Sequence, residues 1–233
     1  MLDLHGYGPG IFKGAILTME LAVLSLLLAI LLGLLGALAK LSKSGFARGA
    51  ATTYTTIIRG VPDLVLMLLI FFGLQELVND VSELIYEKFE YDFFINIDAF
   101  VAGVFTIGFI FGAYMTETFR GAFMAVEHGQ IEAGKAYGMS GLQIFKRILF
   151  PQMMRHALPG LGNNWLVLLK TTALVSVIGL ADMTRLAKEA AGAVHEPFKF
   201  FIPVALVYLV VTSISEFGLK RLEAHYSAGV ARG

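Results

Sequence analysis

The longest apolar run in the chain covers residues 15–39, and Glu20 is its only charged residue. A helix of that length reaches about 37 Å, enough to cross a ~30 Å hydrocarbon layer with some tilt. A cleaved signal peptide is the competing interpretation, because residues 37–39 mimic a small-residue cleavage site. The run is longer than a signal core, however, and it follows Asp3 instead of a basic cluster. It therefore predicts a membrane-spanning helix.

Four further apolar runs follow, at residues 54–74, 100–124, 160–181 and 197–218. With 57% hydrophobic and 15% charged side chains and a mean hydropathy of +0.73, the chain cannot be an ordinary soluble domain. The most apolar part of the second run, residues 64–74, is too short to cross alone, so the predicted helix starts earlier and includes Arg59 and Asp63. We expect an all-α membrane protein with about five transmembrane helices in one domain, residues 1–233.

The charged residues between these runs predict how the chain is oriented, because basic residues of short loops stay in the cytoplasm. The segment after the first run has no acid and carries Lys40, Lys43 and Arg48. The segment after the second run has Lys88 alone against Asp80, Glu83, Glu87, Glu90, Asp92 and Asp98. The C-terminal tail is again basic, with Lys220, Arg221 and Arg232 against Glu223. This pattern places the N-terminus outside and the C-terminus in the cytoplasm.

The loop of residues 126–158 then lies on the cytoplasmic side and is unusually apolar for a linker. Gly138 and Gly141 interrupt its apolar pattern, which predicts two short helices that meet at a glycine bend. Its apolar surface either packs on the protein's own spans or forms a docking surface for a cytoplasmic partner. Composition alone leaves both interpretations open.

The motif of this loop resembles a known family. Its residues reproduce the spacing of the EAA loop in the membrane subunits of ABC importers, with Glu132, Ala133, Gly134, Gly138, Ile148 and Pro151. Gly134 stands where alanine is usual and Phe150 where leucine is usual. The similarity extends to residues 59–62, 117–121 and 169–174. Within the polar amino-acid group of this family, the chain is most similar to the first permeases of histidine and lysine/arginine/ornithine systems.

This resemblance implies a permease subunit with the type I importer fold in the inner membrane of a bacterium. Such a subunit forms half of a pair, commonly with a similar but non-identical permease, above two ATPase subunits that bind ATP and magnesium. A soluble binding protein delivers the solute from outside. The loop would serve as the coupling helix, with Glu132, Ala133, Gly138, Ile148 and Pro151 transmitting motion from the ATPase. The chain itself would hold no cofactor.

Asp63 is the most informative charged residue inside a predicted span, because such residues need a partner, water or a function. As in the resembling histidine and basic amino-acid permeases, its carboxylate could receive the cationic group of a basic amino acid such as histidine, arginine, lysine or ornithine. The alternative is an ion pair with Arg59, four residues earlier on the same predicted helix. Asn164 and Thr172 offer polar groups to the pathway on either side of Lys170, which could instead neutralise Asp182 or Asp63.

Two other patterns favour structural roles. Glu117 and Arg120 are three residues apart on the third span and predict an ion pair that braces its inner end. Gly108 and Gly112 form a G-x-x-x-G pair, which predicts a close helix crossing. Such a crossing could lie within the chain or at a subunit interface.

Several other functions find little support. The chain has no cysteine, and its five histidines are scattered without metal-ligand spacing, so we predict no metal site. A P-loop-like run at residues 129–136 ends in Ala136 where Ser or Thr should hold magnesium. The formal net charge of zero gives no sign of nucleic-acid binding. Four alternatives remain. The chain could be a membrane enzyme, an ion-driven carrier, a structural half of an importer whose partner holds the solute, or a permease for another polar amino acid such as glutamine.

Overall fold

The structure is a computed structural model that describes residues 4–89 and 96–227, so Glu90, Asp92 and Arg232 lie outside the described residues. Every regular element in these ranges is a helix, which confirms the all-α prediction. In chain order the elements are α1 (Gly8–Leu41), α2 (Gly45–Gly60), α3 (Asp63–Phe89), α4 (Ala99–Met124), α5 (His128–Ala136), α6 (Gly141–Ile144), a π-helical turn (Phe145–Leu149), α7 (Phe150–Thr171), a 3₁₀-helix (Thr172–Ile178), α8 (Met183–Val194) and α9 (Pro197–Tyr226).

Five helical stretches in the described part of the chain are long and apolar enough to cross a membrane. They are Gly8–Leu41, Asp63–Phe89, Ala99–Met124, Gly141–Ile178 and Pro197–Tyr226. The runs predicted at 15–39, 100–124 and 197–218 lie inside the first, third and fifth of these stretches. The second and fourth runs differ from the prediction, and in both cases a proline is involved.

The predicted helix over residues 54–74 is wrong as a single element, because the structure divides it between α2 and α3. α2 ends at Gly60, Val61 is extended with φ −116° and ψ 139°, and α3 begins at Asp63. Pro62 explains the break, since proline has no N–H for the helix ladder and disfavours helical geometry at the residue before it. α3 then continues to Phe89, well past the predicted end.

The fourth span begins earlier than residue 160. Its helical stretch starts at Gly141, and Pro159 lies inside α7. The second half of the predicted loop is therefore not a separate short helix: α6 runs through the π-helical turn into α7. In that turn the Phe150 N–H donates to the Phe145 carbonyl, five residues back. Such a wide turn accommodates the missing N–H of Pro151 in the next turn of helix.

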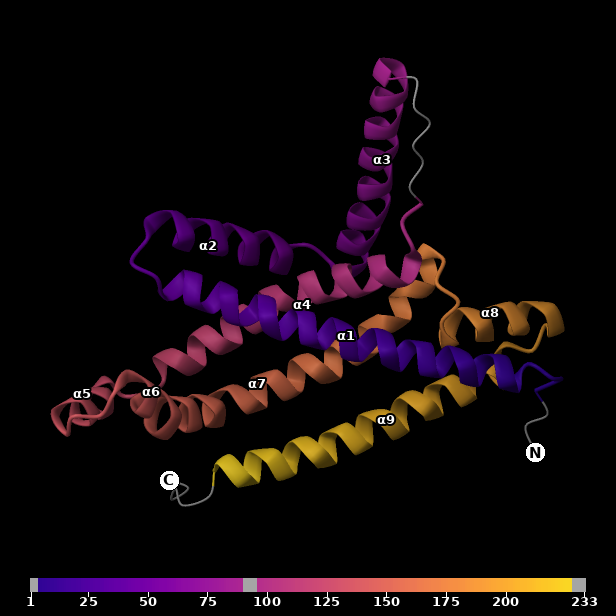
Figure 1. Cartoon of the computed structure of the whole chain (residues 1–233). Coiled ribbons are helices and arrows are strands. Elements are labelled where there is room, and N and C mark those ends of the chain that lie inside the picture. Colours follow the sequence, from indigo (N-terminus) through magenta and orange to yellow (C-terminus); the bar gives the residue numbers. More distant parts are fainter. Residues whose placement is uncertain (1–3, 90–95, 228–233) are drawn as a thin grey trace.

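The helices α1, α4, α7 and α9 lie alongside one another, and α2 folds back next to α1 (Figure 1). α3 projects away from this bundle. The helices α5 and α6, which belong to the predicted coupling loop of residues 126–158, lie at the same end of the bundle as the end of α9, whereas α8 lies with the start of α1 at the other end. This arrangement agrees with the alternation of sides that the charges predict.

Glycines allow α1 and α4 to approach closely along their length. A Cβ at Gly112 would come within 2.8 Å of the Leu32 Cβ, and one at Gly33 within 2.6 Å of the Met115 Cβ. Gly108 likewise faces the side chain of Leu28. The crossing predicted from the G-x-x-x-G pair therefore lies within the chain, between α4 and α1.

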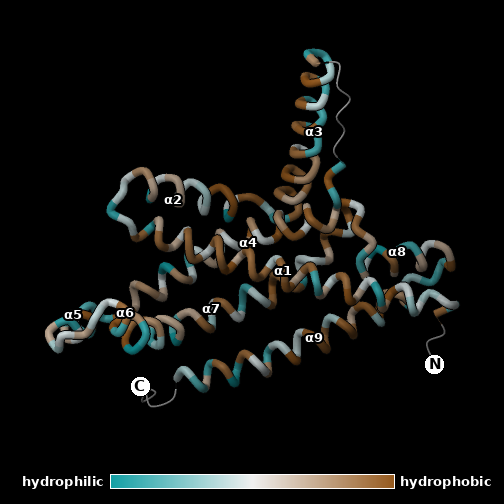
Figure 2. Tube along the Cα trace, in the orientation of Figure 1, coloured by the Kyte–Doolittle hydropathy of each residue, from teal (hydrophilic) through white to brown (hydrophobic). Residues whose placement is uncertain are grey.

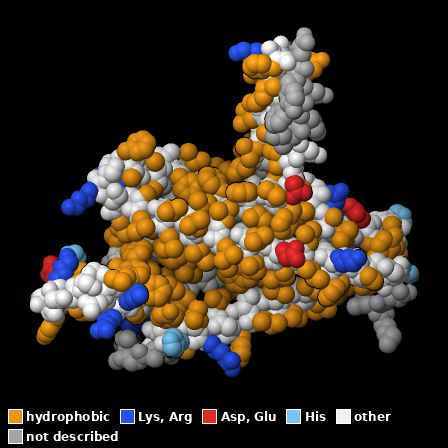
Figure 3. Space-filling model, in the orientation of Figure 1, with side chains coloured by type: hydrophobic (Ala, Val, Ile, Leu, Met, Phe, Trp, Pro, Cys, Tyr) orange, Lys and Arg blue, Asp and Glu red, His pale blue; other side chains and the backbone are white. Residues whose placement is uncertain are grey.

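Apolar side chains also cover most of the outside of the bundle. Brown residues recur along α1, α4 and α9, and hydrophobic side chains dominate the visible face (Figures 2 and 3). Only 11% of the most apolar window of α3 and of α9 is buried, against 61% of that of α4. α4 is thus the centre of the fold, and α3 and α9 leave apolar surface for lipid or for another subunit.

Candidate translocation site and coupling loop

The break between α2 and α3 places the carboxylate of Asp63 at the first turn of α3, half-buried. The N-terminus of a helix carries a partial positive charge and free N–H groups, which favour a carboxylate there. The Tyr114 hydroxyl of α4 donates to Asp63 Oδ1 at 3.5 Å. Asp63 therefore keeps acceptor capacity for a further donor.

The predicted ion pair between Arg59 and Asp63 is absent, because the two residues lie on different helices instead of one turn apart. The guanidinium of Arg59 lies over the ring of Tyr114, 5.7 Å from its centroid. In the described part of the chain no basic side chain lies within 4.0 Å of the Asp63 carboxylate. Tyr114 separates the two charges, a role that no local spacing indicates.

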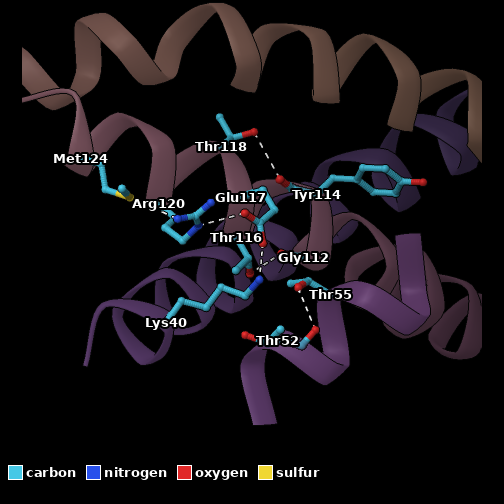
Figure 4. Close-up of polar contacts among 10 residues, drawn as sticks. All are labelled: Lys40, Thr52, Thr55, Gly112, Tyr114, Thr116, Glu117, Thr118, Arg120 and Met124. Carbon is cyan, nitrogen blue, oxygen red and sulfur yellow. Dashed lines mark hydrogen bonds and ion pairs between the residues drawn. The ribbon is translucent and has the colours of Figure 1, made fainter. Parts of the chain in front are cut away.

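Glu117 joins two basic side chains in the half of α4 that leads to α5 (Figure 4). Its Oε2 accepts from Arg120 Nε at 3.0 Å, the contact that their spacing predicts. Its Oε1 accepts from Lys40 Nζ at the end of α1, a partner that the sequence analysis missed. Only 11% of the Lys40 side chain and 19% of that of Glu117 are exposed. The cluster therefore ties α1 to α4 close to the coupling loop.

The other predicted pathway residues make contacts inside the bundle. Asn164 Nδ2 donates to the Thr118 hydroxyl at 3.0 Å, which links α7 to α4. Thr172 is fully buried: its hydroxyl donates to the Leu169 carbonyl at 2.7 Å and lies 3.3 Å from the Tyr208 hydroxyl. No part of the Thr172 side chain is accessible in this structure, and its contact with solute stays a prediction.

Lys170 and Asp182 do not pair with each other. Asp182 is buried and caps α8, where it accepts from the backbone N–H groups of Thr184 at 3.1 Å and Arg185 at 3.0 Å. Burial raises the pKa of the Asp182 carboxyl, and these hydrogen bonds oppose that shift. Lys170 is exposed on the bundle and forms no ion pair in the described ranges. Asp182 thus has a structural role at the N-terminal end of the fold.

The coupling loop turns sharply at Gly138, between α5 and α6. Gly138 has a φ of 74°, and the Gly138 and Met139 N–H groups donate to the carbonyls of Lys135 and Gly134. This is a Schellman ending, in which the residue with positive φ is usually glycine. Ser140 then caps α6 through a capping box with Gln143. Local sequence alone therefore fixes the bend.

The remaining residues of the motif fall on two faces. Gly134 is buried against α6 and the π-helical turn, where a Cβ would lie 2.9 Å from Ile148 Cδ1. A side chain in place of Gly134 would press on this contact. Glu132 and Ala133 are exposed on α5, and Pro151 lies in the first turn of α7. Tyr137 and Leu142, with 89% and 62% of their surfaces exposed, extend the outer face.

Comparison with known proteins places this geometry in a family. Residues 12–227 match the family described as binding-protein-dependent transport system inner membrane component. The chain belongs to this family. As a member it is a multi-pass inner-membrane permease of an ABC importer, a transport component whose ATPase is a separate subunit.

Related permeases match the chain over nearly its whole length. It is 52% identical over 229 residues to the histidine/lysine/arginine/ornithine transport system permease protein HisQ of Escherichia coli, covering 98% of each chain. It is 40% identical to the octopine transport system permease protein OccQ of Rhizobium meliloti, covering 100% of this chain and 98% of the relative. These matches confirm the resemblance that the loop motif indicates.

Solved structures agree with the helical arrangement. A crystal structure of an amino acid ABC transporter with histidines superposes with a TM-score of 0.78 and 34% identity, covering 96% of this permease and 97% of that chain. The MetNI methionine ABC transporter in an inward-facing conformation gives a TM-score of 0.65 at 14% identity, with 94% of each chain covered. The second match supports the fold alone.

Proposed function

We propose that this permease carries basic amino acids, and that Asp63 contacts their cationic group. The carboxylate of Asp63 carries this proposal, because it is half-buried at a helix start and its one described side-chain partner is a neutral hydroxyl. A cationic solute would supply the missing charge, and charge-assisted hydrogen bonds are among the stronger polar contacts. The names of the relatives, which refer to histidine, lysine, arginine and ornithine, support the same class of solute.

We further propose the composition of the assembly. The permease pairs with a similar but non-identical permease, and two ATPase subunits on the cytoplasmic side bind the ATP and magnesium. A soluble binding protein delivers the solute at the opposite face. The N-terminus lies outside and the C-terminus in the cytoplasm, which puts α5 and α6 on the ATPase side of the membrane.

The coupling loop would transmit the nucleotide cycle to the helices. The bend at Gly138 and the contact of Gly134 with Ile148 hold α5 rigidly on α6. α6 continues through the π-helical turn and Pro151 into α7, so a push on α5 reaches a membrane helix without a flexible linker. The exposed Glu132, Ala133 and Tyr137 would face the ATPase groove, and rigid-body motion there is a common switching device.

The test compares uptake of arginine and of glutamine by the assembled importer in liposomes. The Asp63→Asn variant keeps the shape of the side chain but removes its charge. We expect arginine uptake to fall by about tenfold or more, while glutamine uptake changes little, because the lost contact is a charge-assisted one. The Asp80→Asn variant, at an exposed position on the same helix, is the control and should transport normally.

Either of two results would contradict the assignment. Unchanged arginine transport by the Asp63→Asn variant would mean that the partner permease holds the solute. Efficient transport of glutamine but not of arginine by the natural chain would assign another polar amino acid.

A further inference from the structure

α2 differs from the neighbouring membrane helices because one stripe of its exposed face is polar. Thr52, Thr56 and Arg59 are exposed and follow i, i+4, i+7 spacing, which places them on one stripe of the helix. The next stripe has the same spacing and is buried, with Ala51, Thr55 and Ile58 packed against the bundle. Ile57 lies on the other side of the exposed face and is 55% exposed.

The hydroxyls of this stripe are available to water or solute. The buried Thr55 hydroxyl donates to the Thr52 carbonyl at 3.2 Å (Figure 4). The hydroxyls of Thr52 and Thr56 have no protein partner in the described part of the chain. A hydroxyl without a partner is costly in an apolar medium, and a guanidinium facing lipid is costlier still. The stripe therefore does not suit contact with lipid, whereas the leucines of α1 do.

The position of α2 places this stripe between Asp63 and the end of the bundle where α5 and α6 lie. α2 starts near the end of the bundle where α5 and α6 lie and leads to the base of α3 (Figure 1). Asp63 stands at that base, one residue beyond the break. The 16 residues of α2 extend for about 24 Å, most of the thickness of a hydrocarbon layer. The Thr52–Thr56–Arg59 stripe covers about 12 Å of this length, in the half of α2 next to Asp63, and the helix continues from it toward the cytoplasm.

We propose that the Thr52–Thr56–Arg59 stripe of α2 is a wall of a water-filled inner passage, along which the solute leaves Asp63 for the cytoplasm. The nature of the solute rests on the proposed function, but the presence of water along α2 does not. At the end of the stripe next to α3, Arg59 and Asp63 offer both signs of charge. A basic amino acid also carries both signs, in its α-carboxylate and its cationic groups.

The absence of cysteine from the chain makes a direct test possible. Three adjacent variants, Thr56→Cys, Ile57→Cys and Ile58→Cys, sample the polar stripe, the apolar exposed face and the buried face. Each is assembled with its partner subunits in lipid nanodiscs and treated with a charged, membrane-impermeant methanethiosulfonate. We expect Thr56→Cys to react at least about tenfold faster than the other two, because thiol reactivity follows thiolate formation and access to water. Thr52→Cys should react like Thr56→Cys.

The pattern of rates decides between the possible coverings of α2. Equal rates at positions 56 and 57, or no reaction at position 56, overturn the proposal; the second result would indicate that the partner permease covers the stripe. As an independent measure, the Thr52→Val/Thr56→Val double variant should lower arginine uptake severalfold, while the double Ser variant retains it. Normal uptake by the Val variant would also count against the passage.

These results separate this proposal from the proposed function. If Asp63→Asn leaves the solute preference unchanged but the Thr56→Cys variant still reacts fast, the water-filled passage stands and the basic amino-acid assignment fails. If Asp63→Asn abolishes arginine uptake and the Thr56→Cys variant is inert, Asp63 binds solute but the exit does not follow α2.

Discussion

Asp63 and Glu117 show how two carboxylates among apolar helices can have opposite roles. Glu117 is held between Lys40 and Arg120, so its charge is balanced within the chain. Asp63 has a tyrosine hydroxyl and a helix start, which stabilise a charge without neutralising it. The first arrangement suits a fixed link between helices, and the second suits a group that meets a changing partner.

Removing the charge of Glu117 should destabilise the assembled importer. In the Glu117→Gln variant one acceptor oxygen is replaced by an NH2 group that faces a cation, and Lys40 and Arg120 lose their counter-charge in a mostly buried position, which should cost about 1–3 kcal/mol. The Glu189→Gln variant is the matched control, since Glu189 pairs with Arg185 on α8, outside the candidate spans, where 57% and 37% of their side chains are exposed. Such a pair contributes about 0–1 kcal/mol. Thermal unfolding of the purified complex measures both, and equal shifts would contradict a bracing role for Glu117.

At the scale of elements, the coupling loop depends on one backbone conformation. A Cβ at Gly138 would meet open space, so the cost of a substitution arises from its φ of 74° and not from a clash. The left-handed conformation costs a non-glycine residue about 1–2 kcal/mol, and the cost is smallest for asparagine. We expect Gly138→Val to lower solute-stimulated ATP hydrolysis, Gly138→Ala to do so less, and Gly138→Asn to stay close to normal.

Gly141→Ala provides the control for this series, because Gly141 is helical, has open space around it and has no positive φ. Its hydrolysis should match that of the natural chain. If the Gly138→Val and Gly141→Ala variants support solute-stimulated ATP hydrolysis equally well, the bend does not need glycine. The proposal that α5 transmits motion rigidly to α7 is then wrong.

The elements differ in how far their sequences predict them. Long apolar runs located α1, α4 and α9, because one periodic pattern covers each helix. The break at Pro62 and the continuous helix through Pro159 could not be told apart from sequence, since each proline lies just before a strongly apolar stretch, residues 64–74 and 160–181. The difference depends on packing: α7 lies against α4 and α9, with Gly160 and Gly162 next to Thr118 and Leu219, whereas α3 projects from the bundle.

Contacts between helices were harder to predict than contacts within one. The spacing of Glu117 and Arg120 indicated their pair, but nothing local connects Lys40 to Glu117, 77 residues later. The same holds for Tyr114, which lies between Arg59 and Asp63 only because α4 passes under the break. Thr172 is a polar residue within an apolar run, which is typical of a pathway residue. Its burial against Tyr208 follows from the position of α9.

At the scale of the whole molecule, the central helix of the single chain is packed on several sides, whereas helices at the edge of the fold expose apolar surface. α4 is surrounded by α1, α2, α3 and α7, while α3 and α9 expose most of their apolar surface. The inferred passage along α2 also has one wall only within this chain. A second permease would supply the opposite wall, which agrees with an importer in which each permease forms half of the pathway.

The two ends of the molecule should therefore be distinguishable by their accessibility from each side of the membrane. Gly192 of α8 and Gly129 of α5 are matched positions: both are exposed, helical and surrounded by open space. Because the chain has no cysteine, Gly192→Cys and Gly129→Cys each introduce a single thiol. In intact spheroplasts an impermeant thiol reagent should label only Gly192→Cys, and in inside-out vesicles only Gly129→Cys, since basic loops stay in the cytoplasm. The reverse pattern would place α5 outside and remove any contact between the coupling loop and an ATPase.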